Sequence, residues 1–200
     1  MKKIFLVLIT GCVFSALASA SIAVVLDGTP VFNGTDYTWT YAAELGDFEG
    51  IGYSVPSYFT IYDFLGLDSV VSVPTDWTFS EQLTGVTPSG VTPTDDPNIE
   101  NVTFYYNGPE AQGPESLGDF VLASSDSALN PNGNFAYQTG VGTTDGPNGG
   151  GGGDPVTGVG LLTVPAGAVV PEPKLELVMA LGVAFIGLAA RRNLRKPSTI

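Results

Sequence analysis

Hydrophobic and polar residues alternate with a period of two along most of residues 21–164, which is the pattern of half-buried β-strands. The alternation is clearest at 37–41, where three aromatic residues alternate with threonines and would share one face of a strand. No stretch of this segment has the 3.6-residue period of an amphipathic helix. We therefore expect eight or nine short strands, at residues 21–26, 37–41, 58–64, 70–73, 77–83, 102–107, 119–123, 135–137 and 159–164.

Turn-forming residues separate these segments, because Gly, Pro, Asn and Asp fill the gaps between them. The Asn33-Gly34 pair predicts a tight hairpin turn, since both residues tolerate positive φ. For residues 21–164 we predict an all-β fold: an antiparallel β-sandwich, jelly-roll or Greek-key like, in which two sheets each bury one apolar face. A glycine-rich loop is expected at 145–154 and a short spacer at 165–170.

The N-terminal end has the three parts of a secretory signal. Two lysines precede a mostly apolar run at 4–14, and small residues follow it. The run is shorter than the roughly 20 residues that a spanning helix needs. We predict a signal peptide over residues 1–20, with Ala18, Ala20 and Ser21 at the cleavage site.

Lipoprotein processing is an alternative for the same end. Residues 9–12 resemble a lipobox in which Cys12 is acylated. That alternative leaves an apolar region of only residues 4–9 and places apolar residues directly after the lipid, so signal peptidase I is favoured. Under the favoured interpretation the single cysteine is removed and the exported chain has no disulfide.

The C-terminal end combines a proline motif, an apolar run and a cluster of cations. Residues 175–190 are mostly apolar and would span about 24 Å as a helix, at 1.5 Å per residue. They predict a transmembrane helix, with charged side chains only near its start. The positive-inside rule places the following cations in the cytoplasm and residues 21–170 outside. The motif residues are Pro171, Glu172 and Pro173, and the cations of the cytoplasmic stop are Arg191, Arg192, Arg195 and Lys196.

This order of motif, helix and cationic tail, from 170 to 196, resembles the PEP-CTERM sorting signal of bacterial exported proteins. The resemblance implies recognition of residues 171–173 by exosortase, a membrane-embedded cysteine transpeptidase, with cleavage nearby. It further implies an inner-membrane intermediate in a Gram-negative type bacterium, followed by release to the cell envelope or to the exopolysaccharide matrix of a biofilm. The segments 37–41, 59–64, 76–78 and 101–106 are similar to a recurring PEP-CTERM ectodomain type, which has no assigned activity.

Charge narrows the possible functions. The chain has 7 Lys and Arg, 20 Asp and Glu and no His, for a net charge of −13. All seven cations belong to the two ends, because residues 4–173 contain no Lys, Arg or His. This composition excludes a Ser-His-Asp triad, a histidine metal site, a Schiff base and an arginine clamp on phosphate. It also excludes nucleic acid as a partner, because binding to phosphates depends on Lys and Arg.

Calcium is the ion that this composition suits best, since Ca²⁺ takes oxygen ligands from Asp, Asn and carbonyl groups. The acidic pair Asp95-Asp96 and two Asp- and Asn-rich loops are candidate sites, although Asp and Asn also favour turns that bind nothing. No obligate cofactor is expected. The candidate metal ligands in the two loops are Asp126, Asn132, Asn134, Asp145 and Asp154.

Carbohydrate binding and glycoside hydrolysis are the remaining alternatives. A glycosidase needs two carboxylates about 5 to 10 Å apart, but no acidic pair here has a recognisable motif around it. We therefore expect no enzymatic activity and retain a calcium- or carbohydrate-binding surface module as the alternative function. Aromatic rings could stack on sugars, but the core is the more common place for them; the rings concerned are Trp39, Tyr41, Tyr62 and Trp77.

Overall fold

The computed structural model describes residues 22–47, 49–53, 55–141 and 155–167. These residues form twelve β-strands and no helix, so the predicted all-β class is confirmed. The strands are β1 (Ile22–Leu26), β2 (Val31–Phe32), β3 (Tyr37–Leu45), β4 (Glu49–Ile51), β5 (Tyr58–Ile61), β6 (Leu67–Ser72), β7 (Trp77–Gln82), β8 (Asn101–Tyr106), β9 (Ala111–Gln112), β10 (Glu115–Ser124), β11 (Ala128–Val141) and β12 (Pro155–Ala166).

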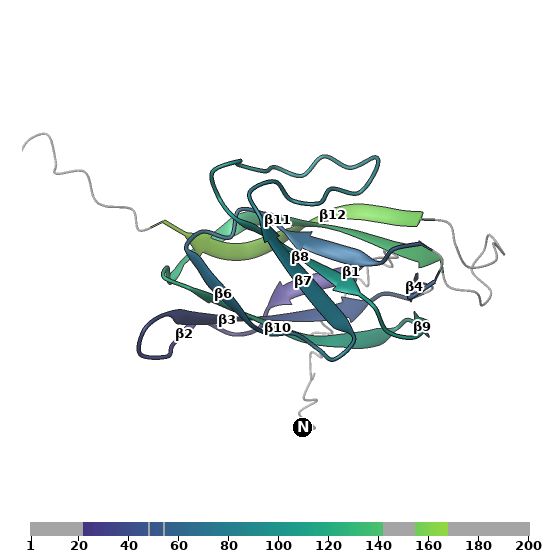
Figure 1. Cartoon of the computed structure of the whole chain (residues 1–200), viewed down its shortest axis with the longest axis horizontal. Coiled ribbons are helices and arrows are strands. Elements are labelled where there is room, and N and C mark those ends of the chain that lie inside the picture. Colours follow the sequence, from purple (N-terminus) through teal and green to yellow (C-terminus); the bar gives the residue numbers. More distant parts are fainter. Residues whose placement is uncertain (1–21, 48, 54, 142–154, 168–200) are drawn as a thin grey trace, which may run out of the picture. The chain divides into compact units, whose positions relative to one another are not determined.

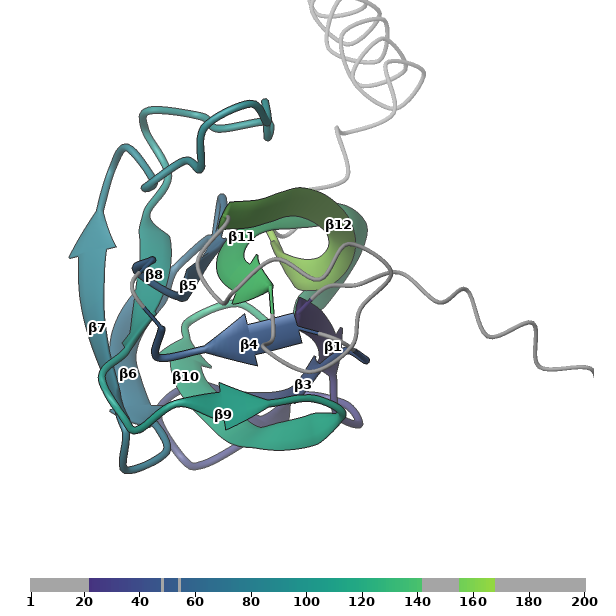
Figure 2. The same cartoon turned by 90° about the vertical axis from the view of Figure 1, so that its right-hand side faces the viewer.

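The strands make two sheets, and every strand pair is antiparallel. The five-stranded sheet has the order β1-β3-β10-β6, with β2 also paired to β3. The seven-stranded sheet has the order β7-β8-β5-β11-β4-β9, with β12 also paired to β11. Figure 1 shows the crossing directions of the strands, and Figure 2 shows the strong curvature that β11 and β12 share.

Aromatic side chains join the two sheets. Phe120 of β10 in the five-stranded sheet packs edge-on against Phe59 of β5 and at a steep angle to Phe104 of β8, with ring centroids 4.9 and 4.8 Å apart. Such pairs add about 0.5–1.5 kcal/mol to the free energy of burial. Two antiparallel sheets that bury their apolar faces against each other are consistent with the predicted β-sandwich.

The aromatic residues considered as sugar platforms are core residues. Trp39, Tyr41, Tyr62 and Trp77 are all buried. The Trp39 indole donates a hydrogen bond to the carbonyl oxygen of Asp126 (3.1 Å), and the Tyr41 hydroxyl donates one to the carbonyl of Thr163 (3.0 Å). Their polar atoms therefore tie distant segments together, as buried Tyr and Trp usually do.

The hairpin expected at Asn33-Gly34 forms between β2 and β3, but its connection is a four-residue loop instead of a tight two-residue turn. Only Gly34 adopts positive φ, at 110°. The side-chain oxygen of Asn33 accepts hydrogen bonds from the backbone amides of Thr35 and Asp36, at 3.0 and 2.9 Å. The asparagine therefore shapes the loop through its side chain and not through its own φ.

The last two strands are much longer than the sequence predicts. Asn130 and Gly133, whose residue types indicate a turn, flank a register shift inside β11, so the pairing with β12 continues on both sides of a bulge. The final strand reaches Ala166, two residues into the expected spacer. The chain divides into two units between Gly167 and Ala168, and all described residues belong to the first unit.

A long connection, residues 83–100 between β7 and β8, covers part of the outer face of the seven-stranded sheet (Figure 1). We call it the covering loop. Two hydroxyl groups donate hydrogen bonds of 2.8 Å to the carbonyl oxygen of Val86. One belongs to Thr60 of β5, the strand next to β8, and the other to Tyr62, the residue that follows β5. A Cβ added to Gly85 would lie 2.4 Å from the Tyr62 ring, so only glycine permits this approach. The covering loop is thus packed and bonded to the sheet.

Candidate functional site

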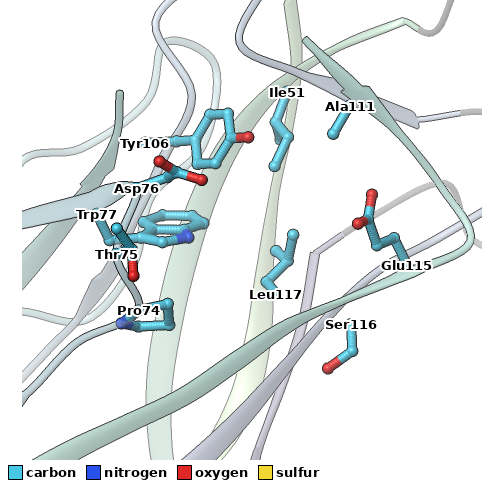
Figure 3. A pocket seen from close by; sticks show the side chains of 10 residues that line it. All are labelled: Ile51, Pro74, Thr75, Asp76, Trp77, Tyr106, Ala111, Glu115, Ser116 and Leu117. Carbon is cyan, nitrogen blue, oxygen red and sulfur yellow. The ribbon is translucent and has the colours of Figure 1, made fainter. Parts of the chain in front are cut away.

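A pocket of about 250 Å³ opens where both sheets contribute residues at one end of the domain. Its polar groups come from the β6–β7 connection, from β7 and β8, and from the start of β10, while β4 and β9 add apolar side chains. Figure 3 shows the ten side chains that line it: Ile51, Pro74, Thr75, Asp76, Trp77, Tyr106, Ala111, Glu115, Ser116 and Leu117.

A β-bulge in β10 shapes one wall of the pocket. The pairing of β10 with β3 shifts register between Ser116 and Gly118, and Gly118 has a φ of 91° that favours glycine. Leu117 is the extra residue of the bulge and is buried, whereas Glu115 and Ser116 remain exposed. The bulge therefore places an apolar side chain in the pocket and keeps two polar ones at its rim.

A close backbone contact shapes the opposite wall. The amide of Gly113 donates a hydrogen bond of 3.0 Å to the carbonyl of Glu49, and a Cβ on Gly113 would lie 2.0 Å from the Gly46 carbonyl oxygen. Only glycine allows this approach, which lets β9 pair with β4. Ala111 of β9 then lies opposite Ile51 of β4, and both face the pocket.

Trp77 and Tyr106 form the aromatic wall, with ring centroids 5.2 Å apart at an interplanar angle of 62°. The Tyr106 hydroxyl donates a hydrogen bond of 2.7 Å to the Pro109 carbonyl. Trp77 is only 5% exposed; its indole N–H donates no hydrogen bond to a described residue, and the nitrogen is not among the buried polar atoms that lack a partner, so it remains accessible at the pocket. Figure 3 places the indole nitrogen on the side of the ring that faces Leu117.

Two carboxylates, from Asp76 and Glu115, flank the pocket on opposite sides (Figure 3). Burial raises the pKa of the Tyr106 hydroxyl, and the negative charges of Asp76 and Glu115 raise it further. Neither carboxylate accepts a hydrogen bond from another described residue, and no Lys, Arg or His occurs among those residues. The pocket therefore carries negative charge and free hydrogen-bond acceptors.

This arrangement can bind hydroxyl groups or small cations, because a carboxylate accepts hydrogen bonds from hydroxyl and ammonium groups and coordinates metal cations. Two carboxylates in one cleft are also the minimal equipment of a glycosidase. Asp76 and Glu115 are far apart in the sequence, and neither belongs to a motif. Only the packing of β7 against the β9–β10 segment brings them together, so sequence reasoning did not single them out.

The expected calcium loop from Asp126 to Asn134 is not a loop in the described chain. It is mostly strand from Ala128 onward, because these residues pair with β12. The amide nitrogen of Asn134 donates to the Thr94 carbonyl of the covering loop at 3.1 Å, and its buried amide oxygen has no partner among the described residues. Asn132 instead donates its backbone N–H to the Asn130 side chain within the bulge, at 3.1 Å.

Asp126 and Asn134 contact different segments, because the backbone N–H of Asp126 donates a hydrogen bond to the Ser124 hydroxyl oxygen of β10 (3.0 Å), whereas Asn134 bonds the covering loop. Asp126 and Asn134 share no hydrogen-bond partner among the described residues. Within the ranges described, no group of three or more His, Cys, Asp or Glu side chains could hold a metal ion. Asp145 and Asp154 lie outside those ranges, as does the glycine-rich loop 145–154.

The acidic pair Asp95-Asp96 lies beside Asp63, which has a φ of 53°. The Asp63 carboxylate accepts a hydrogen bond from the backbone N–H of Asp96 (2.7 Å). The side-chain amide of Asn101 donates a hydrogen bond to the Asp95 carboxylate (2.9 Å) and accepts one from the backbone N–H of Asp63 (2.8 Å). Burial raises the pKa of Asp63, and the negative charges of Asp95 and Asp96 raise it further. The hydrogen bond from the Asp96 backbone N–H lowers the same pKa in part. Hydrogen bonds from Asn98 lower the pKa of Asp96. These acids fasten the covering loop to the sheet.

The predicted targeting residues lie outside the described ranges. No helix among the residues of those ranges is long and apolar enough to cross a membrane. The residues concerned are Ala18, Ala20 and Ser21 of the signal cleavage site, Pro171, Glu172 and Pro173 of the sorting motif, and Arg191, Arg192, Arg195 and Lys196 of the cytoplasmic stop, together with the expected helix 175–190.

Comparison with known proteins yields no relative. The chain matches no protein-family model, no curated protein and no solved structure.

Proposed function

We propose that this chain is an exported bacterial protein that exosortase processes and leaves at the cell envelope or in the exopolysaccharide matrix, without catalysis of its own. One observation carries the proposal: Pro171-Glu172-Pro173 precedes an apolar run and a cationic tail in the order that the sorting signal requires. An inner-membrane intermediate in a Gram-negative type bacterium precedes release. The partners are exosortase, the membrane before processing, and exopolysaccharide.

The positions of the described strands are compatible with this proposal. They lie between Ile22 and Ala166, inside the predicted cleavage after Ala20 and the motif that begins at Pro171. Cleavage at either end would leave all twelve strands intact. We propose that this domain is a β-sandwich with jelly-roll or Greek-key connections.

The test compares wild-type cells with cells that lack exosortase, using immunoblots of membrane, envelope and medium fractions. We expect a smaller form in the envelope or medium of wild-type cells and a larger, membrane-bound form in the mutant strain. Glu172→Ala in wild-type cells should reproduce the larger form. The matched control Glu110→Ala, an exposed acid in the β8–β9 connection, should be processed normally. The same size and location in both strains would refute the proposal.

A second candidate function, a carbohydrate-binding surface module, is favoured by the pocket of Asp76, Trp77 and Glu115. It is compatible with the first, because a protein of the extracellular matrix would meet polysaccharide there.

A further inference from the structure

We propose that the pocket binds one hydroxylated ring of a neutral polysaccharide. The inference rests on the proposed function for the place where the polymer is met. The binding chemistry itself is argued from the pocket alone.

The hydrogen-bonding groups of the pocket require a ligand that both donates and accepts. Asp76 and Glu115 offer free acceptors, and the Trp77 indole N–H is a donor without a partner among the described residues. Trp77 as a whole is 5% exposed, but its indole nitrogen is not among the buried polar atoms that lack a partner, so this N–H is accessible to a ligand in the pocket. A sugar hydroxyl can donate to a carboxylate and accept from an indole N–H, and neighbouring hydroxyls on one ring can do both at once.

Cations satisfy only part of this set. An ammonium group has donors alone, so it would pair with the carboxylates but leave the Trp77 N–H unpaired. Calcium takes six to eight oxygen ligands, and the pocket offers two carboxylates beside a few neutral oxygens. Acidic sugars are disfavoured, because Asp76 and Glu115 would repel them and no described residue carries a compensating positive charge. A neutral hydroxylated ring is therefore the ligand that fits best.

The size and lining of the pocket set how much of the polymer enters. Its volume of about 250 Å³ is below the roughly 300–1,000 Å³ of sites for drug-sized ligands, which corresponds to a single ring. Leu117, Ile51 and Ala111 provide apolar contact for the C–H groups of that ring. The Trp77 ring packs against Phe59, Tyr106 and Phe120 and is only 5% exposed, so binding uses the indole N–H instead of stacking on an open ring face.

The experiment is a titration followed by tryptophan fluorescence. The full-length chain is purified in a polyoxyethylene detergent, which contains no sugar, and is titrated with D-glucose, D-galactose, D-mannose and N-acetyl-D-glucosamine. Parallel titrations use choline chloride, calcium chloride and D-glucuronate. We expect a saturable change with at least one neutral sugar and none with the other three compounds, because a ligand at the indole edge alters the surroundings of Trp77.

Substitutions then locate the site. Asp76→Asn and Glu115→Gln should each weaken sugar binding about tenfold, the loss expected for one charge-assisted hydrogen bond. Ala111→Leu should abolish binding by filling the pocket while keeping both charges. The control Asp119→Asn removes an exposed acid of β10 outside the pocket and should bind as wild type does. Asp76 and Glu115 form no hydrogen bond through their side chains with described residues, so these variants should fold, which near-UV circular dichroism checks.

Several outcomes would overturn the proposal. They are the absence of saturation with all four neutral sugars, saturation by choline, calcium or glucuronate instead, and sugar binding that Asp76→Asn, Glu115→Gln and Ala111→Leu leave unchanged. Release of p-nitrophenol from p-nitrophenyl glycosides, lost in Asp76→Asn, would overturn a purely binding role. None of these results depends on processing, so failure of the sugar titration and failure of the exosortase experiment are distinguishable.

Discussion

Glu49 of β4 is the one acidic side chain that is buried among the described residues, at 1% exposure. Its carboxylate accepts a hydrogen bond from the Thr139 hydroxyl of β11. No described residue supplies a positive charge to pair with it. Burial raises its pKa above the ordinary 4.5, and the bond from Thr139 opposes the change only in part. The fold therefore favours the protonated form of this group.

Because the folded-state pKa of Glu49 is raised, its contribution to stability is fully present below its ordinary pKa of 4.5 and is lost as the pH rises through the raised value. Glu49→Gln removes the buried charge and keeps an oxygen that accepts the Thr139 hydroxyl. We expect a higher Tm at pH 7, by about 2–4 °C for each kcal/mol recovered in a chain of this size. Thermal melts by circular dichroism between pH 4 and pH 8 measure the effect, and the fall of Tm with pH should become shallower.

The control for Glu49→Gln is Glu44→Gln, at an exposed position of the preceding strand β3. This substitution also removes one negative charge, so it separates burial from net charge. A lower Tm at pH 7 for Glu49→Gln than for the wild type would contradict the prediction.

The covering loop is the element whose position depends most on single hydrogen bonds. It has no strand or helix of its own, and polar side chains of the sheet hold its backbone. Asn101, at the start of β8, is completely buried and bonds both the Asp63 amide and the Asp95 carboxylate. Its amide group thus links the end of β5 to the covering loop.

Asn101→Ala should lower the free energy of unfolding by about 1–3 kcal/mol, because it removes a completely buried amide group and leaves the partly buried Asp63 N–H without an acceptor. Urea denaturation of the purified chain measures this loss. Limited proteolysis should also cut the covering loop faster, since the Asp95 contact is lost as well. The control Asn98→Ala, at an exposed position of the same loop, should change stability by less than about 0.5 kcal/mol. Equal effects of the two substitutions would refute this assignment.

Strands with a strong alternating pattern were predictable, and short or interrupted ones were not. Residues 37–41 alternate aromatic and polar side chains, and β3 includes them in the expected register, with Trp39 and Tyr41 buried. β4 and β9 have only three and two residues, too few for a period to appear. The turn-type residues at 130–133 indicated a loop because a bulge also uses such residues, and sequence alone does not separate the two.

The pocket could not be predicted from the sequence. Asp76 lies between β6 and β7, and Glu115 is the first residue of β10, so the two are far apart in the sequence. They line the same pocket only because the two sheets pack together. The bulge at Gly118 and the close contact at Gly113 are equally invisible as local patterns, because each depends on a partner strand. What the sequence does determine is the charge of the pocket: its carboxylates have no Lys, Arg or His among the described residues to pair with.

At the scale of the molecule, the described domain carries charge of one sign. Its residues contain no Lys, Arg or His, so no salt bridge forms among them and the carboxylates repel each other. Packing of aromatic and aliphatic side chains must therefore stabilise the fold against this repulsion.

Salt should raise the stability of the chain. Increasing the salt concentration from about 0.01 M to about 1 M shortens the screening length from roughly 30 to 3 Å and weakens the repulsion among carboxylates. We expect Tm to rise by several degrees over this range, as measured by thermal melts in NaCl. Potassium chloride should give the same increase, because screening does not distinguish the two cations. A fall of Tm with added NaCl would contradict the prediction.

The placement of β12 has a mechanical consequence. Within the described ranges β12 pairs only with β11, and the chain continues beyond Gly167 from the end at which Ala166 pairs with Ala128. A pull on a tether at that end would load this ladder and the hydrogen bond from Tyr41 to the Thr163 carbonyl before it reached the aromatic contacts between the sheets. The protein would then yield to shear or flow by local peeling of one strand, while Phe59, Phe104 and Phe120 kept the rest of the domain assembled.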